Sequence, residues 1–148
     1  QVQVAYNGEL VRLAPGPVRI VDDAPVGRLF RDGRLIVPSG DGPVRERRKL
    51  AMSGIIVVAL ALSRRGELMS DPQIAIDGVP LEDEAGDPMD EIVLSAVEGT
   101  LRSIPRDRRR DLDMVTEAVR RAVRGGVASA WGKKPIVKVL VSVIEGKG

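Results

Sequence analysis

The stretch RERRKLAMSGIIVVALALSRRGEL, Arg45–Leu68, decides the fold, because it joins a basic cluster to an apolar run. The uninterrupted apolar part is Gly54–Leu62. A helix that crosses a bilayer needs about 20 apolar residues, so this run is too short for a membrane anchor. Ile and Val dominate it, and the pairs Ser53-Gly54 and Arg65-Gly66 are turn signals on either side. The run therefore predicts a central strand that is buried on both faces.

The composition limits the chemistry of the chain. Hydrophobic residues make up 43%, enough for a core without metals or disulfides. Cysteine is absent, which fits a reducing compartment, and we expect a cytoplasmic location without membrane association. Histidine is also absent, which excludes His- or Cys-based triads and leaves only oxygen ligands, suited to Mg or Ca. The three aromatic residues disfavour base stacking as a binding mode.

Charge is unevenly distributed along the chain. Seven acidic residues and no basic residue lie between Asp77 and Glu91. Eleven basic and four acidic residues lie between Arg102 and Lys138, a local balance of +7. The basic stretch is compatible with two readings, a phosphate-binding face and an ordinary solvated helix face.

The pattern beyond the linker predicts five elements after a short helix at 43–52. Strands are expected at 54–63 and 67–76, and Pro72 within the second of these predicts an edge position or a bulge. A helix opens at Asp87, with Pro88 in its first turn, and a second begins near Asp111 and ends at Gly132. Residues 133–145 form the last strand. The fold class is α+β: a small two-layer β-β-α-α-β domain, with a three-stranded sheet and two helices.

The region before the short helix predicts an irregular β linker segment. Alternation around Asn7-Gly8 predicts a hairpin, and short extended pieces follow that must bury their apolar residues on a neighbour. Ser39–Gly42 is a predicted hinge. The chain begins with Gln in an apparent strand, so we expect a piece of a longer protein. The predicted domains are 1–42 and 43–148.

Two helices can cover only one face of a three-stranded sheet. Both alternate sets of side chains in the strand at 54–63 are apolar, and the last strand is mostly apolar on both faces. Large apolar patches rarely stay exposed, so the N-terminal segment or another chain must cover the second face. The pattern therefore predicts association.

The stretches RRKLAMSGIIVVALALSRRGELMSDPQI and GKKPIVKVLVSVIE resemble the C-terminal domain of the ribonuclease J family. NGELVRLAPGPVRIVDDAPVGRLFRDG resembles the segment that leaves its metallo-β-lactamase-like domain. The chain departs from the family at DGVPLEDE, where an Arg-Gly-Phe element is more common.

The resemblance implies a role in a metal-dependent ribonuclease that cuts RNA from the 5′ end and internally. Zinc or manganese would sit in a catalytic domain upstream, and no cofactor or catalytic residue is implied in this chain. In some members the residue at Asp32 binds a second, non-catalytic divalent cation. The resemblance also implies a homodimer or tetramer formed through the C-terminal domain, and contacts with RNA and other RNA-degradation factors.

Three roles remain open for the charged residues. A non-catalytic assembly domain is the first, and an auxiliary RNA-binding module on the basic helix faces is the second. In the third, the acids Glu82, Asp83, Glu84 and Asp87 chelate Mg for a reaction of their own. The residues predicted to bind RNA, or to dock against the catalytic domain, are Arg45, Arg48, Lys49, Arg120, Arg121 and Arg124.

Overall fold

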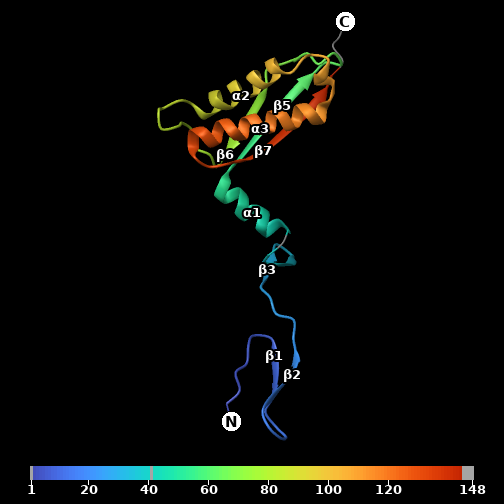
Figure 1. Cartoon of the computed structure of the whole chain (residues 1–148), viewed down its shortest axis with the longest axis vertical. Helices are drawn as coiled ribbons and strands as arrows, with labels where there is room; N and C mark the ends of the chain where they lie inside the picture. Colours follow the sequence, from blue (N-terminus) through green and yellow to red (C-terminus); the bar gives the residue numbers. More distant parts are fainter. Residues whose placement is uncertain (1, 41, 145–148) are drawn as a thin grey trace. The chain divides into compact units, whose positions relative to one another are not determined.

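The computed structural model describes residues 2–40 and 42–144 (Figure 1). The chain forms two compact units, Gln1–Arg47 and Arg48–Gly148. The first unit contains short strands, and the second contains a three-stranded sheet with two long helices. Helix α1 (Gly42–Ser53) includes the boundary between them.

The sheet of the second unit is built around strand β5 (Ile55–Leu62). The neighbours of β5 are β6 (Gln73–Asp77), which is antiparallel to it, and β7 (Ile136–Val143), which is parallel to it. The prediction of a central strand is therefore confirmed. Its apolar side chains on both faces reflect its position between two other strands.

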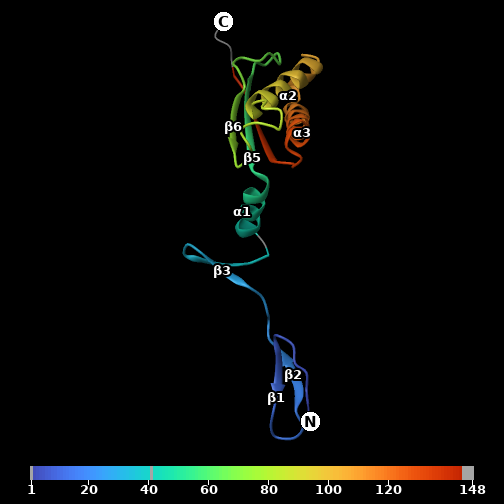
Figure 2. The same ribbon diagram turned by 90° about the vertical axis from the view of Figure 1, so that its left-hand side faces the viewer.

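Two helices cover one face of this sheet. Helix α2 (Met89–Ser103) and helix α3 (Leu112–Trp131) are joined through a 3-10 turn at Arg108–Arg110. Figure 2 shows both helices on the same side of the sheet. The two-layer α+β architecture is thus the predicted one. In the described residues, no helix combines the length and the apolar composition needed to cross a bilayer.

The core lies between the helices and the sheet. Each element contributes one apolar stripe: in β5 every second residue, in α2 and α3 every fourth residue. Burial of each such side chain contributes about 1.5–3 kcal/mol. The buried residues of the three stripes are Ile56, Val58, Leu60, Leu62, Met89, Val93, Val97, Leu101, Val115, Val119, Val123 and Val127.

The ends of α3 follow the predicted signals. The Asp111 side chain accepts a hydrogen bond from the Met114 amide at 3.0 Å, and Gly132 ends the helix in the left-handed conformation. The pair Gly125-Gly126 lies inside the helix without interrupting it. A Cβ atom at Gly126 would meet Ala96 of α2 at 3.7 Å, an ordinary contact, and one at Gly125 would meet nothing within 4 Å.

Two element starts differ from the predictions. Helix α2 begins at Met89, and no side chain caps it, because the loop before it is organised by Asp83. The Asp83 carboxylate accepts hydrogen bonds from the amides of Ala85 (2.8 Å) and Asp87 (3.0 Å). Strand β6 is an edge strand, as predicted, but it begins only after Pro72, which has no amide hydrogen to donate.

The first unit contains two separate strand pairs. Strand β1 (Glu9–Arg12) pairs with β2 (Arg19–Asp23), and β3 (Leu29–Asp32) pairs with β4 (Leu35–Pro38). The hairpin predicted around Asn7-Gly8 is wrong. That pair forms a turn before β1, and the partner of β1 comes after the following loop instead of from residues 2–5.

The apolar side chains of the first unit remain largely open. Exposure reaches 39% for Ile20, 67% for Leu29 and 71% for Ile36. This agrees with an irregular β segment that buries little of its own surface. Position 41 of the predicted hinge lies outside the described residues.

Candidate functional site

A pocket of the second unit gathers four basic side chains. They come from the last turns of α1, the middle of α3 and the segment before β7. Three of the residues predicted to bind RNA, Lys49, Arg120 and Arg124, are thus brought together. No acidic side chain lines the pocket, whose residues are Lys49, Arg120, Arg124, Lys134, Pro135, Ile136 and Val137.

Helix α3 places two of the cations by its periodicity. Arg120 and Arg124 are four residues apart and therefore lie on the same side of the helix, one turn from each other. The neighbouring positions Val119 and Val123 are fully buried in the core. The packing of α3 on the sheet thus fixes the direction in which the two arginines project.

Gly54 fixes the end of α1 that carries Lys49. Its amide donates to the Leu50 carbonyl at 2.8 Å, and its carbonyl accepts from the Ile136 amide at 3.1 Å. Gly54 has φ +63°, and a Cβ atom there would lie 2.5 Å from the Gly78 carbonyl oxygen. Only glycine fits this position. The last turn of α1 and the starts of β5 and β7 are therefore held together.

Glu117 orients Arg120 through two short hydrogen bonds. Arg120 Nε donates to Glu117 Oε2, and Arg120 Nη2 donates to Glu117 Oε1, each at 2.7 Å. Arg121 Nε also donates to Oε1, at 2.6 Å. The hydrogen bonds from Arg120 and Arg121 lower the pKa of Glu117 to about 2, so its carboxylate stays charged at neutral pH. The fork of Arg120 is thus held, while Nη1 takes no part in these two bonds.

The other three predicted binding residues lie outside the pocket. Arg121 is exposed on α3 and binds Glu117. Arg48 is exposed on α1 and does not line the pocket. Arg45 belongs to the first unit. Their assignment to RNA binding or docking stays a prediction.

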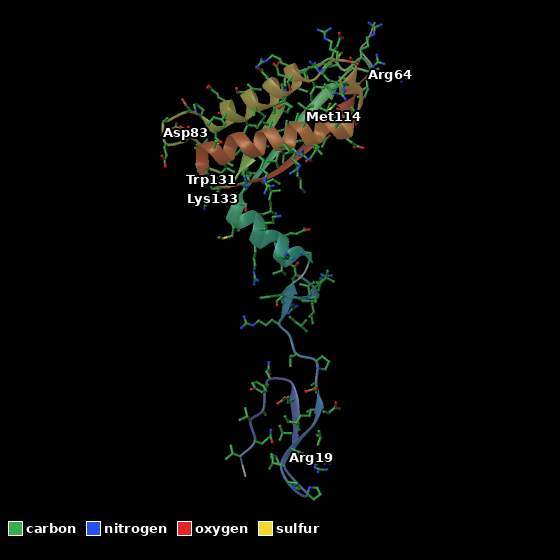
Figure 3. All side chains as sticks on the ribbon, in the orientation of Figure 1. Arg19, Arg64, Asp83, Met114, Trp131 and Lys133 are labelled. Carbon is green, nitrogen blue, oxygen red and sulfur yellow. The ribbon has the colours of Figure 1, made fainter. Side chains whose placement is uncertain are left out.

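Lys134 is the pocket residue that sequence reasoning missed. It lies two residues before β7, and the parallel pairing of β7 with β5 brings it to the end of the sheet at which α1 enters. The only sequence signal was the pair Lys133-Lys134 next to the helix stop at Gly132. Lys133 itself lies with Nζ 5.2 Å from the centre of the Trp131 ring, a cation–π contact at the end of α3 (Figure 3).

The outer face of the sheet, opposite the helices, has no helix of the second unit over it (Figure 2). Along β5 this face is entirely apolar, and along β6 and β7 it is mixed. Its residues, in rows across β6, β5 and β7, are Asp77, Ile55 and Ile136; Ala75, Val57 and Lys138; Gln73, Ala59 and Leu140; and Ala61 and Ser142 in the last two strands.

Exposure confirms the difference between the two faces. The outward residues of β5 are half-buried where the inward ones are fully buried, and Leu140 is 60% exposed. A hollow on this face is lined in part by Ala59, Ala61 and Leu140. A half-buried apolar strip with polar margins has the general composition of a protein interface.

Asp32, the predicted ligand of a second cation, has a different contact in the structure. Its Oδ2 atom lies 2.9 Å from Arg47 Nη2. In the described part of the chain, no group of three carboxylates, histidines or cysteines is placed to hold a metal ion. A cation at Asp32 would therefore have to displace Arg47 and take its other ligands from elsewhere. The metal role of Asp32 stays a prediction.

Comparison with known proteins gives a consistent result. Residues 42–144 match the family model described as the ribonuclease J C-terminal domain. The chain is 44% identical to ribonuclease J of Sinorhizobium meliloti over 138 residues, which are 93% of this chain and 24% of that protein. It is 28% identical to ribonuclease J of Mycobacterium tuberculosis (strain H37Rv) over 97% of this chain and 25% of that protein. The chain thus spans about a quarter of the length of these relatives.

Proposed function

We propose a function from one premise: the chain belongs to the ribonuclease J family and corresponds to its C-terminal part. The proposed role is a non-catalytic assembly domain, which pairs two copies of the parent enzyme through the outer face of its sheet. Higher assembly to a tetramer would use the same domain twice or a second surface.

The observation that carries this proposal is the apolar strip of β5 on the outer face. Its four side chains lie in one row, and Leu140 of the neighbouring strand extends it with 60% of its surface exposed. A second copy presents the same strip, and a two-fold axis brings identical patches into contact. The polar residues at the margins, Asp77 and Lys138, carry opposite charges that such an axis can pair.

The catalytic chemistry belongs to the remainder of the parent enzyme in this proposal. The chain has neither His nor Cys, so it cannot supply the nitrogen or sulfur ligands of a zinc site. We propose that the parent cuts RNA from the 5′ end and internally, with zinc or manganese held outside this chain. It would act in the cytoplasm, where other RNA-degradation factors are candidate partners.

Size-exclusion chromatography with light scattering tests the assembly role. We expect the chain to reach the mass of a dimer, and we expect Leu140→Glu to reduce that mass to a monomer because a charge would enter the buried strip. The matched control is Leu81→Glu, since Leu81 is 86% exposed in the acidic loop and lies outside the outer face. A folded wild-type chain that is strictly monomeric would contradict the proposal.

A further inference from the structure

We propose that the basic pocket at Lys49, Arg120, Arg124 and Lys134 binds a phosphate group of the RNA backbone. This inference rests on membership of the ribonuclease J family, and it goes beyond the assembly role. The pocket and the outer sheet face are different surfaces, so each can fail without the other.

The first argument is uncompensated charge. Three elements bring four cations to one pocket, and no acidic residue lines it. Glu117 balances part of the charge of Arg120. Among the residues that the structure describes, no carboxylate pairs with Lys49, Arg124 or Lys134. Such a concentration of positive charge attracts an anion from solution, and it gains energy when the anion binds.

The second argument is preorganisation. Arg120 is held by two bonds to Glu117, and the end of α1 is fixed by the contacts of Gly54. Holding a long side chain in one geometry before binding removes part of the entropic cost of binding. A guanidinium with a free edge matches two oxygens of a phosphate, and the neighbouring ammonium groups add charge without demanding an orientation.

The third argument concerns what the pocket can read. Its remaining lining, Pro135, Ile136 and Val137, is apolar and offers no side-chain partner for a base. The nearby aromatic residue, Trp131, already has Lys133 over its ring. Stacking of a base there would require Lys133 to leave. The pocket therefore fits backbone recognition, which is independent of sequence.

The test measures binding of a fluorescently labelled single-stranded RNA oligonucleotide to the 148-residue chain by anisotropy, over a series of salt concentrations. We expect Arg124→Gln and Lys134→Gln each to weaken binding roughly fivefold, which corresponds to about 1 kcal/mol. Each should also reduce the slope of log K against log salt by about 0.7, the value for one lost phosphate contact on a single strand.

The matched control is Arg102→Gln. Arg102 is an exposed arginine on α2, 3.2 Å from Glu98, and lies outside the pocket. Its substitution removes the same charge, and we expect less than a twofold effect on RNA affinity. Circular dichroism of all three variants should show an unchanged fold, since each substituted residue is exposed.

Three outcomes would overturn the proposal. In the first, the chain binds no RNA at low salt. In the second, Arg102→Gln weakens binding as much as the pocket variants, which would mean diffuse attraction. In the third, polyglutamate displaces the RNA at equal charge concentration, which would identify an acidic peptide site. Light scattering of the same variants separates this result from the assembly role: a normal dimer mass with no RNA binding defeats the pocket proposal only.

Discussion

The two faces of the sheet in the second unit use the same strand in different ways. The inward side chains of β5 are at most 2% exposed and contact both helices, while the outward ones are half-buried with no helix of the unit over them. Both sets are apolar. An apolar side chain facing the helices stabilises the fold of one copy, whereas an equally apolar side chain on the other face contributes little until a second surface covers it.

The largest expected effect comes from the same substitution on the two faces. Leu60→Ala should lower the free energy of unfolding by about 2–5 kcal/mol, because it leaves a cavity among buried side chains. Leu140→Ala should change it by less than about 0.5 kcal/mol at protein concentrations too low for association. Urea denaturation followed by circular dichroism measures both. Equal losses would show that the outer face is part of the core.

The next effect concerns the junction at which α1 joins the sheet. Gly54→Ala should cost about 1–3 kcal/mol, since it places a side chain at φ +63° and against the Gly78 carbonyl. The same denaturation experiment applies. A loss below 0.5 kcal/mol, flagged as about the error of the method, would mean that this junction is looser than the structure describes.

A smaller effect of opposite sign is expected on the open side of α3. Gly125→Ala should raise the free energy of unfolding by about 1 kcal/mol, because alanine favours the helix and its Cβ would meet nothing within 4 Å. The control is Gly132→Ala, which should destabilise because Gly132 ends the helix at φ +77°. A destabilised Gly125→Ala variant would mean that something packs against this side of α3.

The smallest effect is the pH dependence of the Glu117 interactions. Its pKa is lowered from 4.5 to about 2 in the folded chain, so its contribution is fully present above pH 4.5 and is lost as the pH falls towards 2. Glu117→Gln should therefore lower the melting temperature at pH 7, and the difference from wild type should shrink below pH 4.5. A difference that is constant from pH 7 to pH 2.5 would contradict this account.

Much of the second unit could be predicted from local signals. The apolar run of β5, the stripes of α2 and α3, the Asp111 cap and the Gly132 stop all depend on neighbouring residues, and the structure has each of them. The apolar character of the outer face followed from the two alternate sets of β5. Its lack of a helical cover followed from the number of helices.

The errors and omissions arose where distant segments decide. Alternation around Asn7-Gly8 favoured a hairpin, but β1 pairs with a later strand, a choice that local pattern does not encode. The basic pocket depends on the parallel register of β5 and β7, which brings Lys134 to the end of α1. Arg109 likewise read as a solvated cation, yet its Nε donates to the Ile104 carbonyl at 2.9 Å.

The most direct test of the outer face as an interface measures a distance between two copies. The chain has no cysteine, so Ser142→Cys gives a single site for a nitroxide label on the outer face, and Ser95→Cys gives a matched site on the exposed side of α2. Pulsed dipolar spectroscopy should yield a short distance between labels at position 142, since facing sheets pack about 10 Å apart. Labels at position 95 should be farther apart. No dipolar signal at position 142, or a shorter distance at position 95, would contradict the account.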